Sequence, residues 1–426
     1  MLAGSFLGDA TSRLLPATIP FGFFTAAAVF HMAAWAALFV GAGDVAGFAG
    51  GPGPVLAAVH LLTLGVLAMV AIGASFQLLP VATRQPLIRV WPARLCFWLM
   101  VPGVVLLSGG MTGASPLALQ VGGGMVASAL FVFAVLSADN LRRAGAMPVV
   151  AAHGWAALCA LVISAGFGVI MIADFSLGFL TNHAAVAVAH MLLAAFGFMG
   201  LLVLGFSLIL IPMFALSRSL PAKPTWAQMW LAVLAIAIGG IAALADNAGL
   251  FLVAIVTGGS AAGVYLWLMR NALRTGMRKR LGISMILVRL AWGLLLVSLL
   301  LGFAIIVDIP APNLPALFGF SVLVGWLLTF LLGVLQRIVP FLASMHASGK
   351  GGLPPLLSDL TPDLPLKLHA GFHLPALLAC SIGILFDLPL ALQIGASAGF
   401  AGSVAFAVFL GLVLSKLNAL PPKSLI

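Results

Sequence analysis

Twelve apolar segments, each long enough to cross a membrane, follow one another along this chain and leave no room for a separate soluble domain. Hydrophobic residues make up 63% of the sequence and charged residues only 7%. Such segments cross lipid as helices, because a helix satisfies its backbone hydrogen bonds internally. We therefore predict an all-α, polytopic membrane protein with a single membrane domain over residues 1–426. The expected spans are about 19–41, 55–80, 93–110, 117–138, 149–173, 184–212, 226–244, 249–269, 283–307, 314–341, 370–387 and 389–415.

A spaced pattern of small residues recurs in the second, sixth and tenth of these spans. It has the form Gly-x7-Gly-x6-Pro and consists of Gly65, Gly73 and Pro80, then Gly197, Gly205 and Pro212, then Gly325, Gly333 and Pro340. The nearly equal intervals indicate an internal repeat. Glycines let a neighbouring membrane helix approach closely, and a proline marks where a helix can stop. The pattern predicts three four-helix repeats, at about 15–145, 146–275 and 276–420, with the glycines in equivalent places.

The basic residues gather in the loops on one side of the predicted membrane. The chain has 19 Lys and Arg against nine acidic residues, all of them Asp. The opposite loops have no Lys or Arg and carry Asp44, Asp174, Asp246, Asp308 and Asp387. Because loops rich in Lys and Arg stay in the cytoplasm, we predict both termini there, in a bacterial-type inner membrane. The basic charge sets topology, so membrane lipid is an expected partner and nucleic acid is not.

Four histidines fall in the outer half of the predicted membrane layer: His31, His60, His183 and His190. An ionisable side chain inside a membrane span is costly and suggests a function. Neutral imidazole is a good ligand for haem iron or copper, which would supply the partner that the ring lacks. The alternative is a neutral histidine that hydrogen-bonds to a backbone carbonyl or a hydroxyl on another helix. Metal binding is predicted first for His60 and His190, which lie in related spans of the repeat.

Two further histidines, His369 and His373, are four residues apart on the predicted cytoplasmic side. This spacing is compatible with a shared metal ion on a helix. Gly371 and Pro375 argue against a regular helix there. We therefore expect the two histidines to lie at the membrane interface without a metal.

The chain resembles subunit I of the heme-copper oxidase superfamily. The residues that carry the likeness are VHLLTLGVLAMVAIGASFQLLPV at 59–81 and GWLLTFLLGVLQRIVPF at 325–341, within twelve helices arranged as three repeats. The likeness is nearest to the oxidase-like branch that includes the NnrS-like proteins. This resemblance implies haem b, copper or both, and a link to respiratory redox or nitric oxide metabolism. It matches His60 to the family's haem ligand on the second helix and His190 to its copper-site histidine on the sixth.

The sequence also departs from that family. The tenth span, 314–341, has no histidine, whereas the family places haem ligands there. Ala194 stands four residues after His190, so the histidine–tyrosine cofactor of many oxygen reductases is missing. The chain has no Glu to match the carboxylates of nitric oxide reductases. These departures argue against a proton-pumping oxidase.

Three classes of function follow from these observations. The first is a membrane protein that binds haem or copper through His60 and His190, with His31 as a further cofactor ligand and His183 as a further metal ligand. It implies a redox partner. The second is a transporter or permease whose histidines bind substrate or protons, although inverted repeats and paired midplane charges are more typical of that class. The third is an assembly factor without a ligand. No catalytic residue is assigned.

Overall fold

The computed structural model describes residues 13–348 and 355–419. Within these ranges it has no strand, and twelve helical spans are long and apolar enough to cross a membrane, which confirms the predicted fold class. Most spans are single helices: α2 (Thr18–Val40), α5 (Trp91–Thr112), α6 (Pro116–Arg142), α7 (Pro148–Leu177), α10 (Ala222–Leu244), α11 (Ala248–Thr275), α12 (Gly282–Ile306), α16 (Asp363–Leu385) and α17 (Pro389–Ala419). A short helix, α15 (Leu357–Leu360), precedes α16.

The second, sixth and tenth spans each contain a wider, π-helical segment. These spans are α3 (Pro54–His60), η3 (Leu61–Ala68) and α4 (Met69–Thr83); α8 (His183–Leu192), η4 (Leu193–Gly200) and α9 (Leu201–Ala215); and α13 (Leu314–Phe320), η5 (Ser321–Leu328) and α14 (Thr329–Ser348). The first glycine of each Gly-Gly-Pro frame is the fifth residue of its π segment. π turns are rare in helices and frequently occur at functional sites.

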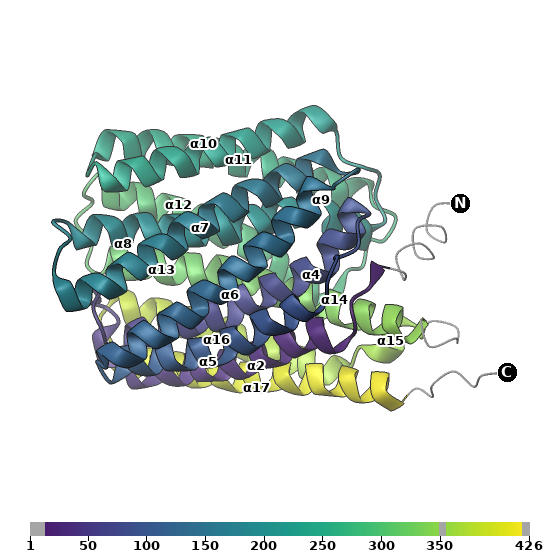
Figure 1. Ribbon diagram of the computed structural model, residues 1–426, viewed down its shortest axis with the longest axis horizontal. Helices are drawn as coiled ribbons and strands as arrows, with labels where there is room; N and C mark the ends of the chain where they lie inside the picture. The colour runs from purple at the N-terminus through teal and green to yellow at the C-terminus, as the bar shows by residue number, and fades with distance from the viewer. Residues whose placement is uncertain (1–12, 349–354, 420–426) are drawn as a thin grey trace.

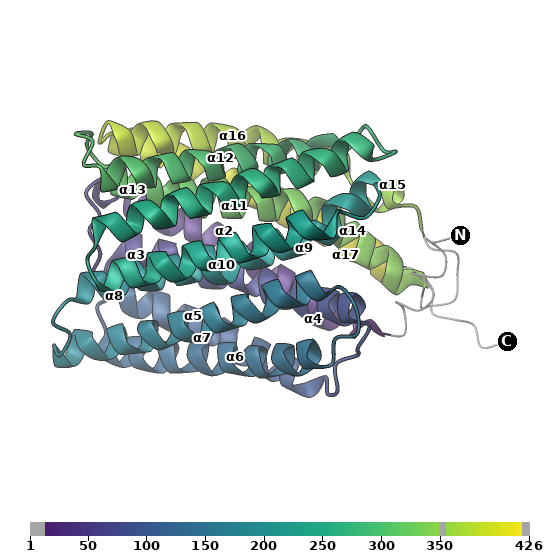
Figure 2. The same cartoon turned by 90° about the horizontal axis from the view of Figure 1, so that it is seen from above.

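These three spans form the centre of the bundle, and we call them the central spans. Of their most apolar windows, 67%, 67% and 72% of the residues are buried, against 22–44% for every other described span. The segment η5 contacts both η3 and η4, so the π turns meet in the core. Figures 1 and 2 show the remaining long helices packed around them. The spans that carry the frame are therefore those shielded most from lipid.

The glycines of the frame are sites of close helix contact. An added Cβ at Gly65 or Gly73 would lie 2.7 Å from Phe30 or Phe23 of α2. The glycines of the other two frames face the preceding helix in the same way: Gly197 and Gly205 approach Ala160 and His153 of α7, and Gly325 and Gly333 approach Leu294 and Ser284 of α12. Distances below 3 Å leave no space for a methyl group, so at most of these contacts only glycine permits the observed spacing.

The prolines of the frame lie inside helices rather than beyond their ends. About one turn after Pro80 and Pro212, α4 and α9 end at left-handed residues, Arg84 and Leu216. By contrast, α14 continues to Ser348, well past Pro340. The expectation that proline marks the helix end is therefore wrong for the tenth span. Its last turns remain helical because they are packed in the core, where side chains such as Leu342 are fully buried.

Each set of four consecutive spans has the same neighbour relations. The last two helices pair as α5 with α6, α10 with α11, and α16 with α17. The first helix packs on the central span of its own set, as α2, α7 and α12 do. Successive sets meet through α6 and α7, α11 and α12, and α17 and α2, which closes a ring. Superposition of the three sets as structural repeats stays a prediction.

The described chain begins and ends at the same side of the bundle (Figure 1). We call this side, where α2 begins and α17 ends, the proximal end, and the side where α8 and α13 begin the distal end. The Lys and Arg residues that the structure describes fall at the proximal end, so the prediction assigns this end to the cytoplasm. The termini themselves, 1–12 and 420–426, lie outside the described residues.

Candidate functional site

The structure brings His60 and His190 together near the distal end of the bundle. His60 is the last residue of α3, directly before the π segment η3. His190 lies in α8, close to the start of η4. The two imidazole rings are nearly parallel, with an angle of 19° between their planes and 6.5 Å between their centroids. Both side chains are partly buried. Two central spans thus present one ring each to a common space.

Hydrogen bonds fix the tautomer of both rings. His60 Nδ1 lies 3.0 Å from the backbone oxygen of Leu56, one turn earlier in its own helix. His190 Nδ1 lies 2.8 Å from the backbone oxygen of Ser164 in α7. A carbonyl oxygen only accepts, so each Nδ1 carries the proton and each Nε2 keeps a lone pair. Neither Nε2 has a hydrogen-bond partner among the described residues.

A glycine in α7 makes room for the His190 ring. An added Cβ at Gly168 would lie 3.4 Å from Cε1 of His190 and 3.8 Å from its Nδ1. The ring therefore rests against bare backbone, and its second nitrogen is bound by a carbonyl of the same helix. Histidines that bind metals are commonly held in this way, with the nitrogen away from the metal donating to a carbonyl or carboxylate.

His31 lies in a different cluster, which it forms with His369 and His373. The His369 and His373 rings are 5.4 Å apart, and His31 is close enough to both for electrostatic interaction. All three side chains are at most 2% exposed. The expectation of an irregular interface segment here is wrong, because α16 runs without a break through Gly371 and Pro375. His369 and His373 lie beyond the first turn of α16, and both are buried inside the bundle.

Side chains from other helices hold this second cluster. The Trp35 indole N–H donates to His31 Nε2 over 2.9 Å. Thr329 uses its only proton to donate to the Val324 carbonyl, so His373 Nε2–H donates to Thr329 Oγ1 over 2.8 Å. His369 Nδ1–H donates to the Gly402 carbonyl over 3.1 Å. Among the described residues, one donor, His31 Nδ1–H, and two acceptors, His369 Nε2 and His373 Nδ1, have no hydrogen-bond partner.

His183 lies at the distal end, apart from both clusters. Its Nδ1 is 2.7 Å from a carboxylate oxygen of Asp174, and its side chain is 35% exposed. The other Asp174 oxygen accepts from the backbone N–H of Leu180 over 2.7 Å. The pair therefore fastens the turn between α7 and α8. Nowhere in the described ranges do three or more His, Cys, Asp or Glu residues form a group that could hold a metal ion.

No protein-family model matches the chain, and no curated protein matches it. The resemblance to heme-copper oxidase subunit I therefore stays an expectation from the sequence.

Sequence reasoning selected the His60–His190 pair but missed most of its supporting contacts. The carbonyls of Leu56 and Ser164 belong to residues with nothing unusual in their side chains or spacing. The partner of His31 was also missed, although it has a signal in the sequence, because Trp35 follows His31 by one helical turn on the same face. Thr329 and Gly168 could be recognised only when the helices were placed beside one another.

Proposed function

We propose that this chain is an integral membrane haem protein in which His60 and His190 would be the residues that hold the haem iron. The observation that carries the proposal is the pair of nearly parallel rings whose Nδ1–H groups are both held by carbonyls and whose Nε2 lone pairs have no partner. Two lone pairs cannot bond to each other. A metal ion is the partner that accepts electron density from both.

The separation of the rings supports this assignment. Imidazole nitrogens bind a metal ion at about 2.0–2.1 Å, which puts the centroids of two opposed rings roughly 6 Å apart. The observed separation is 6.5 Å. A pair of histidines is also a complete protein ligand set for haem, because the porphyrin supplies the other four nitrogens. Copper would need ligands beyond this pair.

Bound haem would supply one-electron redox chemistry, and the resemblance noted in the sequence connects it with respiration or nitric oxide metabolism. The residues of the chain have three tasks at the site. The Leu56 and Ser164 carbonyls orient the rings and keep each Nε2 unprotonated. The glycine at 168 leaves space for the His190 ring. The central spans exclude lipid, so the position of the pair near the distal end would place electron exchange with a redox partner on that side.

An optical spectrum tests the proposal. Protein made in a haem-replete host and purified in detergent should carry about one haem per chain, with the absorption of a haem that has two histidine ligands. His60→Ala and His190→Ala should each lower the haem content at least tenfold. The matched control is His183→Ala, which removes a third histidine at the same end of the bundle and should leave the haem in place.

Two outcomes contradict the proposal. Wild-type protein without haem at near-equal amount would show that the lone pairs are not iron ligands. Equal haem loss in all three variants would show a general effect on folding, which size-exclusion chromatography of each variant would reveal.

A transporter is the second candidate, and one cavity favours it. The proximal halves of the central spans enclose a space of about 100 Å³ lined by Gln77, Phe206, Met213, Phe341 and other mainly apolar side chains. Both polar atoms of the Gln77 side chain are buried without a partner, which is costly unless something binds there. Haem-free wild-type protein that moves a small polar solute into liposomes, with loss of transport in Gln77→Leu, would support this second function.

A further inference from the structure

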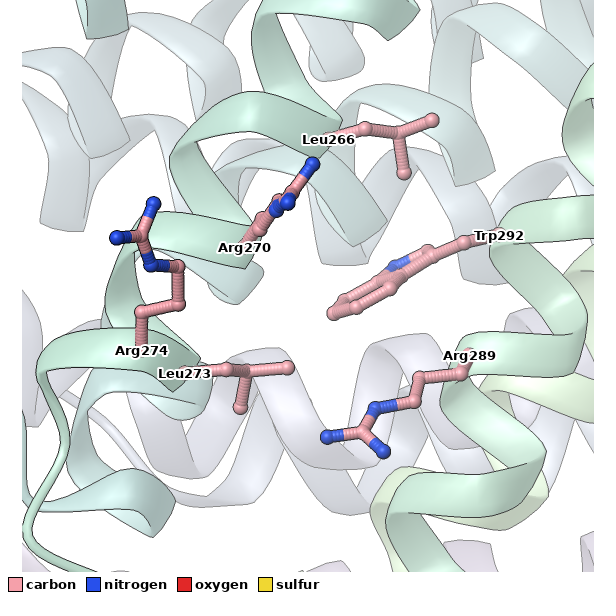
Figure 3. A pocket seen from close by; sticks show the side chains of 6 residues that line it. All are labelled: Leu266, Arg270, Leu273, Arg274, Arg289 and Trp292. Carbon is pink, nitrogen blue, oxygen red and sulfur yellow. The ribbon is translucent and has the colours of Figure 1, made fainter. Parts of the chain in front are cut away.

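A second site lies on the outside of the bundle, far in sequence from the histidine pair. A pocket of about 450 Å³ lies between α11 and α12. Figure 3 shows its lining: Leu266, Arg270, Leu273 and Arg274 from α11, and Arg289 and Trp292 from α12. Three of these six side chains are guanidinium groups, and none of the six is acidic.

The three arginines lack a counter-ion. Within residues 13–348 and 355–419, no carboxylate makes an ion pair with Arg270, Arg274 or Arg289. All three residues are exposed, and in Figure 3 they approach the pocket from two different helices. Like charges so placed repel one another, and an anion between them would relieve that repulsion. Guanidinium groups match phosphate oxygens in geometry and bind them with paired hydrogen bonds.

The depth of the arginines matches the phosphate layer of a bilayer. Arg270 precedes the proximal end of α11 by five residues, which is about 7.5 Å along the helix. Arg289 follows the start of α12 by seven residues, about 10 Å. Both spans are longer than the roughly 20 residues that cross the hydrocarbon layer, so their ends reach into the headgroup zone. The backbone of both arginines therefore lies at or inside the edge of the hydrocarbon layer, from which their long side chains reach the lipid phosphates.

The deeper wall of the pocket is apolar and held in place. Trp292 donates its indole N–H to the Tyr265 hydroxyl over 3.0 Å, and Tyr265 donates to Ser207 over 2.9 Å. The ring is thus fixed and offers the pocket only its apolar surface. Leu266 lies one turn farther from the proximal end than Arg270, so it faces the hydrocarbon side. The pocket combines cationic groups toward the headgroups with apolar surface toward the acyl chains.

We propose that this pocket binds the phosphate of an anionic phospholipid, with its acyl chains on Leu266 and Trp292. Single arginines near the end of a membrane helix commonly reach for the headgroups on their own. Here three from two helices line one hollow, which is the arrangement typical of a specific headgroup site. The site is independent of the histidine pair, and no haem is needed for it.

Native mass spectrometry of the purified full chain tests the proposal. After exchange into mixed micelles of phosphatidylglycerol and phosphatidylcholine, wild-type protein should retain one phosphatidylglycerol through gentle activation. Arg270→Gln/Arg289→Gln should retain at least fivefold less. The control, Arg218→Gln/Lys223→Gln, removes two exposed charges from the same end of the bundle and should bind as wild type does. Equal loss in both double variants, or retention in both, would overturn the proposal.

Two further measurements keep the test decisive. Inorganic phosphate at 10 mM, in about a thousandfold excess over the lipid, should leave the bound phosphatidylglycerol in place; displacement would assign the pocket to free phosphate instead. If the double variant fails to fold, wild-type protein can be labelled with a photoactivatable phosphatidylglycerol. Crosslinks should then concentrate on α11 and α12, and an even distribution around the bundle would contradict a site between them.

Discussion

The two histidine clusters differ in which of their ring nitrogens lack a hydrogen-bond partner. In the pair of His60 and His190, both protons are used by carbonyls and two lone pairs have no donor to meet. In the other cluster, hydroxyl, indole and carbonyl groups satisfy three of the six ring nitrogens, and the remainder is one donor and two acceptors. That remainder includes an N–H group that can donate to a lone pair of the same cluster, whereas the lone pairs of His60 and His190 have no such donor and require a third participant.

The two clusters also differ in how deeply their side chains are buried. His60 and His190 are partly exposed, while His31, His369 and His373 are almost completely shielded. A ligand must be able to reach its site, and buried polar groups that no ligand reaches must find partners in the protein. Whether histidines in a membrane protein can bind a ligand therefore depends more on their tautomers and the direction of their hydrogen bonds than on their number.

Chemical rescue gives the largest expected contrast between the clusters. His190→Gly should lose at least tenfold in haem content, and added imidazole should restore haem absorption by filling the vacated ligand position. The matched variant His373→Gly should keep its haem without imidazole. Absorption spectra with and without imidazole measure the haem content of both variants. An imidazole concentration on the order of 10 mM suits a weak ligand. Haem loss from His373→Gly, reversed by imidazole, would exchange the roles of the two clusters.

Thr329→Val should sharpen the difference through stability. It removes the only acceptor of the His373 Nε2–H group in a core position, which should cost about 1–3 kcal/mol of folding stability. The haem spectrum should not change. Thermal unfolding in detergent measures the first effect, with Thr257→Val as control, since Thr257 is only partly buried and bonds only within its own helix. A stable variant with an altered haem band would show that the second cluster takes part in cofactor binding.

Gly168→Ala should disturb the first cluster alone. The added methyl group would lie 3.4 Å from Cε1 of His190, at the near limit of ordinary van der Waals contact, so the ring could no longer move toward α7. We expect haem to be retained, with a small shift in its absorption or reduction potential. Gly166→Ala, in the same helix with open space around its Cβ, should have neither effect. Identical spectra for both variants would mean that the ring is not restrained at this contact.

The smallest effect is expected from His183→Ala, which changes the turn between α7 and α8 without touching either histidine cluster. A pair with 35% of the histidine side chain exposed is screened by solvent and contributes little to stability. Thermal unfolding should therefore change by no more than a few degrees, and the haem content should equal that of wild type. A tenfold loss of metal or haem in this variant would restore His183 as a ligand.

The sequence predicted the parts of the fold that leave a signal in hydropathy or in residue size. Hydropathy gave the twelve spans, and the Gly-Gly-Pro frame identified the three most buried ones. The frame was informative because close packing leaves a mark in residue size, as the contact of Gly73 with Phe23 illustrates. The orientation assigned to the Lys- and Arg-rich side remains a prediction, because the fold is the same whichever side faces the cytoplasm.

The grouping of the histidines could not be predicted in full. A soluble helix shows its buried face by alternation of polar and apolar residues, but α2 and α16 are apolar around their whole circumference. No periodic signal therefore indicated that His31 faces α16 instead of the pair. The π segments were hidden for a related reason: the sequence of η3 is as apolar as its neighbours and contains no proline.

Those π segments also determine how tolerant the pair is of changes in chain length. A π turn accommodates one residue more than the α-helical turn it replaces, and one residue corresponds to about 100° of rotation. If 61–68 became regular α-helix at unchanged length, the distal half of the span would rotate by about that angle relative to the proximal half anchored by Gly73, and His60 would turn away from His190. Deleting one residue from 61–68 would instead remove the extra residue, so the span could become a continuous α-helix with His60 still facing His190. The extra residue in each central span thus sets how the distal half of the helix is rotated relative to the proximal half.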